Sequence, residues 1–213
     1  MRAATCLLIS IAASSCMYDA DGERLKVVTL DSTKLCFPAS YAPGIHSSDV
    51  QEQIYIPATI VKERIPNYTA SHVNSYGWDY EHDLRGTAYA LSVVDKPTPE
   101  EQQAWNVRTQ SSDVLIEPDP DFPLYRILRS VERRSTWEFV ESSPPENPVG
   151  EPPENWYVGP CLEMAGTYDC VQSAEYMSVA YFYSVSRENL HLRHEVREAV
   201  IDLLANWHEN CAW

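Results

Sequence analysis

Two groups of histidine and acidic residues have the side chains that catalysis or metal binding requires. Glu81, His82 and Asp83 are consecutive, so an imidazole base would stand between two carboxylates that raise its pKa. His191 and His194 are three residues apart, a spacing at which two imidazoles on one helix can bind a metal, but no third ligand is evident. The sequence favours solvated turn residues for the first group and ordinary helix surface for the second. We therefore predict no catalytic residue, no metal site and no cofactor.

The sequence lacks the short motifs that mark common catalytic and nucleotide sites. It contains no Gly-x-Ser-x-Gly elbow, phosphate-binding glycine loop, His-Glu-x-x-His zinc helix or calcium loop. Its 7 glycines form no glycine-rich stretch, which argues against a nucleotide site. A hydrolase whose serine, histidine and acid meet only in the fold stays open as an alternative. The sequence favours a binding protein over an enzyme.

The N-terminus has the composition of a cleaved secretory signal. Residues 1–15 (MRAATCLLISIAASS) contain a positive charge at Arg2, then a short apolar stretch, then small residues directly before Cys16. The apolar stretch is too short to span a bilayer. The small residues before Cys16 resemble a bacterial lipobox, in which the cysteine is acylated and becomes the mature N-terminus. Ala13 departs from this pattern, because the family usually has leucine there.

The lipobox resemblance implies a location for the mature chain. A lipid such as palmitate on Cys16 would be its only membrane anchor, and residues 16–24 would form a polar tether. Met17 follows the cysteine, where lipoproteins retained at the inner membrane usually have aspartate. The resemblance therefore implies a periplasmic protein anchored to the outer membrane. The alternative is an ordinary soluble secreted protein that is cleaved nearby.

The cysteines predict two disulfides. Beyond Cys6 and Cys16, the sequence has an even number of cysteines, as expected in an oxidising compartment: Cys36, Cys161, Cys170 and Cys211. Cys161 and Cys170 flank an Ala-Gly-Thr turn, so they can face each other on neighbouring strands. This leaves Cys36 to pair with Cys211, one of the three pairings that four cysteines allow. A zinc site is the competing use, but no Cys-x-x-Cys motif is present.

The chain is acidic and rich in aromatic residues. It has 31 Asp and Glu against 16 Lys and Arg, a formal net charge of −15, with 6 Trp and 13 Tyr. Such a surface repels phosphates and anionic lipid headgroups, which argues against nucleic acid or membrane as a direct partner. It favours a basic protein partner through electrostatic steering. The alternative is that the negative charge serves only to keep the protein soluble.

The pattern of strands and helices predicts an α+β domain over residues 25–213. A first helix is predicted over residues 97–107 and would carry Trp105. Apolar residues recur at three- and four-residue steps from Leu192 to Trp207, which predicts a C-terminal amphipathic helix. Ser186 can cap this second helix. We expect a disulfide-stapled antiparallel sheet with this helix packed on it. Strands are predicted over residues 25–37 (as a hairpin), 53–65 (interrupted by Pro57), 86–94, 124–131, 136–140, 156–164, 168–173 and 177–186.

Two acidic, proline-containing segments are the candidate binding elements. Residues 141–155 hold five prolines and should form an exposed loop, and residues 117–121 have the same character. Stiffened loops lose less entropy on docking, and a neighbouring aromatic residue can anchor a hot spot. A solvated insertion without a partner is the alternative. The predicted contact residues are Glu117, Asp119, Asp121, Glu146, Glu151, Glu154 and Trp156.

The C-terminal third resembles a known family. The hairpin from Cys161 to Cys170, the aromatic strand VAYFYSV and the final helix VREAVIDLLANW are similar to the end of periplasmic immunity lipoproteins encoded beside type VI secretion effectors. Those proteins occlude the active site of a toxin. The resemblance implies an immunity protein with a secreted toxin as partner, and it transfers no contact residues. An envelope accessory lipoprotein that supports a secretion or surface complex is the alternative.

Overall fold

The computed structural model describes most of the predicted domain, namely residues 22–44, 47–73, 76–94, 105, 114–129, 135–145, 153, 156–164 and 166–211. The predicted signal over residues 1–15, the lipidation at Cys16 and most of the tether lie outside the described residues. So do the helix over residues 97–107, apart from Trp105, and most of the loop over residues 141–155.

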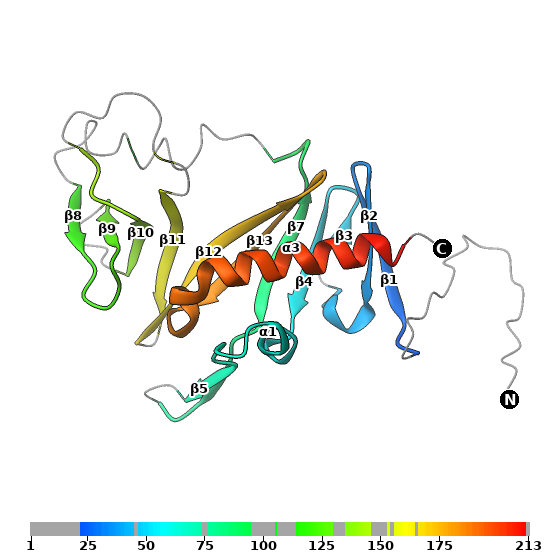
Figure 1. The fold of residues 1–213 in the computed structure, drawn as a ribbon, viewed down its shortest axis with the longest axis horizontal. Helices are drawn as coiled ribbons and strands as arrows, with labels where there is room; N and C mark the ends of the chain where they lie inside the picture. The colour runs from blue at the N-terminus through cyan, green and yellow to red at the C-terminus, as the bar shows by residue number, and fades with distance from the viewer. Residues whose placement is uncertain are drawn as a thin grey trace, which may run out of the picture.

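A twisted antiparallel sheet forms the main layer of the fold (Figure 1) and confirms the predicted class. In the described residues it has nine strands in the order β3-β4-β7-β13-β12-β11-β10-β9-β8. The long central pair β12 and β13 aligns Asp169 with Ser186 and Tyr176 with Val179. The strands are β3 (Ser47–Ser48), β4 (Gln51–Ile56), β7 (Leu84–Ala90), β8 (Leu115–Pro118), β9 (Tyr125–Leu128), β10 (Thr136–Val140), β11 (Tyr157–Met164), β12 (Thr167–Tyr176) and β13 (Val179–Ser186).

The C-terminal helix α3 (Arg193–Glu209) packs on the sheet, as predicted (Figure 1). It follows the 3-10 helix η2 (Arg187–Leu192). Its apolar stripe from Val196 to Trp207 joins the buried cluster that includes Tyr181 and Tyr183 of β13. None of the helices in the described part of the chain is long and apolar enough to cross a membrane.

Two hairpins lie outside the main sheet. The first pairs β1 (Leu25–Leu30) with β2 (Thr33–Pro38), as predicted for residues 25–37, and the short 3-10 helix η1 (Ala39–Tyr41) follows it. The second pairs β5 (Ser71–Val73) with β6 (Asp79–Glu81). Figure 1 shows β5 projecting from the body beyond the helix α1 (Ala58–Arg64).

Both predicted disulfides are confirmed. Cys161 lies directly opposite Cys170 across β11 and β12, and the two are bonded. Cys36 of β2 is bonded to Cys211 just after α3, with 5.3 Å between the Cα atoms and a sequence separation of 175. The second bond therefore joins the start of the fold to its end.

Pro57 separates a strand from a helix, which corrects the predicted strand over residues 53–65. β4 ends at Ile56, and α1 (Ala58–Arg64) begins directly after the proline. The backbone N–H of Ala58 donates to Asp83 Oδ1 at 3.0 Å. This contact satisfies one of the unpaired donors at the helix start. The β-branched residues of the segment favour a strand, but this contact from a distant residue supports a helix.

Ser186 does not cap the C-terminal helix with its side chain, contrary to the prediction. It ends β13, and no side-chain hydrogen bond caps η2. Its hydroxyl lies 2.9 Å from Nδ1 of His82 instead. The serine is therefore part of the polar site described next.

Candidate functional site

A groove of about 530 Å³ opens where one end of the sheet meets the β5–β6 hairpin. The strand register places the ends of β11 and β13 and the starts of β7, β10 and β12 at this end. Charges of both signs line the groove: Arg85 lies 3.5 Å from Asp83, and Arg129 pairs with Glu138. The groove therefore lies between the hairpin and the sheet and combines these charged groups with apolar walls that include Ile127, Trp137 and Leu162.

His82 is a buried polar residue in the wall of this groove. It is 5% exposed, which corrects its interpretation as a solvated turn residue. Its Nε2 lies 2.5 Å from Nδ1 of His72 in β5, and its Nδ1 lies 3.1 Å from Nδ2 of Asn189 in η2. Burial lowers the pKa of His82 more strongly than the carboxylate of Glu188 raises it, which favours the neutral imidazole.

Hydrogen bonds fix the surroundings of His82. Asn189 is fully buried, and its side chain accepts from the N–H of Thr69 at 2.8 Å and donates to the carbonyl of Thr69 at 2.9 Å. The hydroxyl of Tyr68 donates to the carbonyl of His82 at 2.6 Å. These bonds join η2 to the segments that enter and leave the β5–β6 hairpin.

Glu188 of η2 brings a carboxylate to the two histidines. Its Oε2 lies 3.8 Å from Nε2 of His82. One ligand atom from each of His72, His82 and Glu188 lies within 4.8 Å of the others. The Oε2 atom is buried and has no hydrogen-bond partner in the described part of the chain. Two imidazoles and a carboxylate in this arrangement are a donor set that binds divalent transition metals.

The contact between Ser186 and His82 has the length of a nucleophile–base pair, which bears on the hydrolase alternative. Ser186, however, is 8% exposed, and its hydroxyl also accepts a hydrogen bond from Nδ2 of Asn189 at 3.2 Å. These contacts direct the hydroxyl into the polar network. The pair therefore serves to orient the imidazole.

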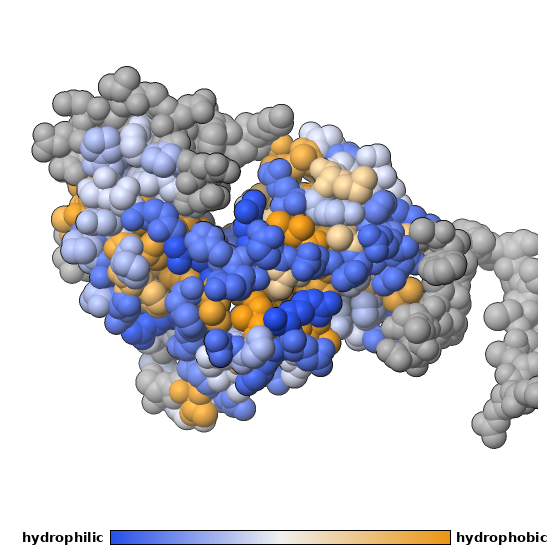
Figure 2. Space-filling view, in the orientation of Figure 1, coloured by the Kyte–Doolittle hydropathy of each residue, from blue (hydrophilic) through white to orange (hydrophobic). Residues whose placement is uncertain are grey.

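The β5–β6 hairpin exposes a row of large aromatic side chains. Tyr76 is 68% exposed, Trp78 66% and Tyr80 44%. The rings of Tyr76 and Trp78 are 6.0 Å apart, and the exposed carboxylates of Asp79 and Glu81 alternate with the aromatic residues. Figure 2 also shows hydrophobic surface at the end of the lower projection, where Figure 1 places β5, whose Val73 is 67% exposed. We call residues 71–81 the aromatic hairpin.

Comparison with solved structures finds a distant similarity. Smlt3025, an immunity protein of the Stenotrophomonas maltophilia type IV secretion system, matches with 12% sequence identity and a TM-score of 0.41. The match covers 92% of this chain and 99% of that chain. No family model and no curated protein sequence matches. At this identity and TM-score the similarity does not establish a shared function. That protein belongs to a type IV system, whereas the sequence resemblance is to type VI-associated lipoproteins.

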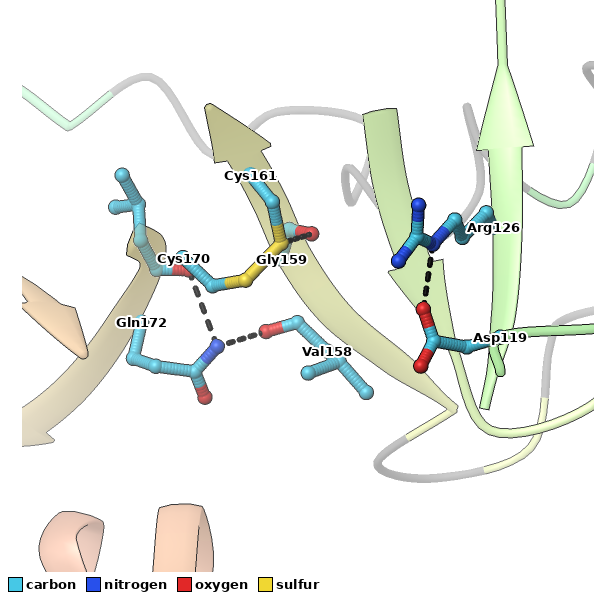
Figure 3. The surroundings of a disulfide bond; sticks show 8 residues. Asp119, Arg126, Val158, Gly159, Cys161, Cys170 and Gln172 are labelled. Carbon is cyan, nitrogen blue, oxygen red and sulfur yellow. Dashed lines mark hydrogen bonds and ion pairs between the residues drawn. A yellow bond between two sulfur atoms is a disulfide. The ribbon is translucent and has the colours of Figure 1, made fainter. Parts of the chain in front are cut away.

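Two of the predicted contact residues are buried and bonded within the chain. The carboxylate of Asp119 accepts from the N–H groups of Asp121 and Phe122, both at 2.9 Å, and from Nε of Arg126 at 2.5 Å (Figure 3). Trp156 is 1% exposed, and its indole N–H donates to the carbonyl of Ser142 at 3.0 Å. Both side chains hold loops in place, and their predicted role in partner binding stays a prediction.

The other predicted contact residues do not gather into one surface. Glu117 is half-buried on β8, and Asp121 pairs with Arg187 at 2.7 Å on the surface. Glu146, Glu151 and Glu154 lie outside the described residues. The structure thus gives these residues no common site, and their role in binding stays a prediction.

Sequence reasoning missed both the aromatic hairpin and the partners of His82. The segment YGWDYEHD at residues 76–83 was the available signal, because aromatic residues at every second position next to carboxylates are unusual for a solvated turn. His72 and Glu188 had no such signal. They are 116 positions apart, from 188 − 72, and only the fold brings them together.

Proposed function

We propose that this protein is an immunity protein that binds and neutralises a basic secreted toxin through the aromatic hairpin. The observation that carries the proposal is the exposure of Tyr76, Trp78 and Tyr80 next to the carboxylates of Asp79 and Glu81. Tyrosine and tryptophan are the residues that most often dominate binding energy at protein interfaces. Leaving them in water is unfavourable, so their exposure suits a surface that a partner covers.

The charge of the chain supports a basic partner. The formal net charge is −15, and the exposed end of the hairpin adds local carboxylates to its aromatic rings. A negative surface raises the association rate of a positive partner, and salt screens this effect. The C-terminal resemblance to immunity lipoproteins supports a toxin as that partner.

We further propose that the chain is exported and anchored to the outer membrane by a lipid on Cys16. The signal-like residues 1–15 and the disulfides, which form in oxidising compartments, support this location. Cells that make the wild type or Cys16→Ser would be labelled with a palmitate analogue. We expect label and outer-membrane fractionation for the wild type alone. An unlabelled wild type would contradict the anchor.

Affinity capture with the tagged full chain tests the proposed function. Envelope and secreted proteins of the producing cell are passed over the wild type at low and high salt, and bound proteins are identified by mass spectrometry. We expect a basic secreted toxin that binds more weakly at high salt and loses its toxicity when mixed with the protein. The double variant Tyr76→Ala/Trp78→Ala should weaken the complex by about 30-fold or more, the size of one hot spot.

Met177→Ala is the matched control for the hairpin variant. Met177 is 61% exposed but lies in the turn between β12 and β13. It should leave binding unchanged. If both variants bind as the wild type does, the aromatic hairpin is not the interface. Capture of envelope machinery would favour the accessory-lipoprotein alternative, and an absence of any partner at either salt concentration would contradict a binding function.

A further inference from the structure

Three metal-binding side chains from separate segments converge beside the groove. His72 lies on β5, His82 directly follows β6, and Glu188 lies on η2. We propose that these residues form a binding site for a divalent transition-metal ion of the zinc class, which ties the aromatic hairpin to the body of the protein. This inference does not depend on the proposed function.

The distances are close to those that a metal ion needs. Tetrahedral zinc with nitrogen ligands at about 2.1 Å requires ligand atoms about 3.4 Å apart. Nδ1 of His72 and Nε2 of His82 are 2.5 Å apart, and Nε2 of His82 is 3.8 Å from Oε2 of Glu188. The distance between the two histidines must lengthen and that between His82 and Glu188 must shorten, each by less than about 1 Å. The third pair, His72 and Glu188, has ligand atoms within 4.8 Å of each other. His72 is only half-buried and belongs to a two-stranded hairpin, so it is placed to move by this amount.

The buried oxygen of Glu188 is an independent observation that points to a ligand. Its Oε2 has no hydrogen-bond partner among the described residues. A carboxylate oxygen that is buried without a partner costs free energy of folding. A cation between this oxygen and the two imidazoles would satisfy it and neutralise its charge.

The residues behind His82 are suited to hold it as a ligand. A metal-bound imidazole usually donates its other N–H to a fixed acceptor, which sets the ring orientation and the tautomer. Nδ1 of His82 lies 2.9 Å from Oγ of Ser186, and a serine hydroxyl can accept as well as donate. The two protons on Nδ2 of Asn189 are accepted by the carbonyl of Thr69 and by Oγ of Ser186, so Nδ1 of His82 does not have to accept one. His82 can therefore carry its proton on Nδ1 and present the lone pair of Nε2 to the metal. Asn189, held by Thr69, keeps Ser186 in place.

The ligand set also leaves room at the metal. Two neutral imidazoles and one carboxylate give a site with three protein ligands, and zinc keeps a fourth position for water or another group. His72 and His82 both line the groove, together with Asp169. Water, or a side chain of a partner bound in the groove, could occupy this fourth coordination position.

Zinc titration of the full chain tests the site. Metal-free wild type, His72→Ala, Glu188→Gln and the control His191→Ala are titrated with zinc chloride by calorimetry. His191 is exposed on η2, the element that carries Glu188. We expect one zinc ion per chain in the wild type and the control, and affinity reduced at least about tenfold in the other two variants. Cys6 and Cys16 are present in all four proteins. A difference in zinc affinity between the proteins therefore does not arise from these cysteines.

The outcomes separate a metal site from a purely structural cluster. Glu188→Gln keeps the shape of the side chain, so it tests the ligand even if His72→Ala perturbs the hairpin. Absence of zinc binding in the wild type, or equal affinity in all four proteins, would overturn the site. Zinc should also slow hydrogen exchange at the amides of β5 and β6 in the wild type. Unchanged exchange would overturn the proposal that the metal ion holds the aromatic hairpin against the body of the protein. No partner is present in either measurement, so the proposed function is tested separately.

Discussion

Asp119 illustrates how a single buried carboxylate can organise a loop. Its side chain is buried, and it accepts two backbone N–H groups together with the guanidinium of Arg126. That guanidinium also lies 4.6 Å from the ring centre of Trp137. Removing one member of a buried pair leaves the other charge without its partner, which is more costly than losing an exposed pair.

We expect Asp119→Ala to lower the free energy of unfolding by about 3–5 kcal/mol. Asp121→Ala is the control, because its ion pair with Arg187 is 40% exposed on both sides and exposed pairs contribute about 1 kcal/mol or less. Urea unfolding followed by tryptophan fluorescence measures both values. Equal losses in the two variants would contradict a structural role that is special to Asp119.

Buried tyrosines should make the fold sensitive to alkali. Burial raises the pKa of Tyr68, Tyr181 and Tyr183 above the ordinary value of 10.0. The hydroxyl of Tyr181 contacts the carbonyls of Ile54 and Leu84, both at 2.8 Å. In the unfolded chain these phenols lose their protons near pH 10, whereas in the fold they keep them.

Below pH 10 the tyrosines are protonated in both states, so they do not change the free energy of unfolding. Above pH 10 only the unfolded state loses these protons, so the free energy of unfolding should fall as the pH rises. Absorbance of tyrosinate against pH measures this. We expect the buried tyrosines to ionise in a late, cooperative phase that coincides with unfolding followed by circular dichroism. A single phase near pH 10 with the fold intact would contradict the prediction.

At Gly86 the backbones of β7 and β13 approach each other too closely for a side chain. A Cβ atom at this position would lie 2.0 Å from the carbonyl oxygen of Phe182 in β13. We expect Gly86→Ala to force β7 and β13 apart and to cost about 1–3 kcal/mol, the usual range for overpacking. Thr87→Ala, at the next residue of β7, is the control and should cost less. Thermal unfolding of both variants measures the difference.

The sequence predicts most strands and the helix, because these follow from local periodicity. The alternation of β12 and β13 and the stripe from Leu192 to Trp207 are visible without any tertiary contact. The helix after Pro57 is not, since the start of α1 is capped by Asp83 from a distant segment. The polar site was missed for the same reason, because Glu188 meets His82 only after β13 and η2 are placed.

The two disulfides should differ in what they contribute to the whole molecule. The bond between Cys36 and Cys211 closes a loop with a sequence separation of 175, and that between Cys161 and Cys170 one of 9. Longer loops lose more entropy in the unfolded state when they are closed. On this model, replacing both cysteines of the long loop by serine should cost about 4–5 kcal/mol, and of the short loop about 2–3 kcal/mol. Denaturant unfolding without reductant tests the order, and the reverse order would contradict it.

The long disulfide also sets how the molecule responds to mechanical force. A chain pulled by its two ends transmits tension from β1 to Cys36 and then across the covalent bond to Cys211. The nine-stranded sheet lies within the bridged loop and carries no load, so only β1 and the segments next to it can be peeled away. In a single-molecule pulling experiment, reductant should release a further extension on the order of 600 Å. While this disulfide is intact, pulling on the two ends of the chain does not deform the groove or the aromatic hairpin.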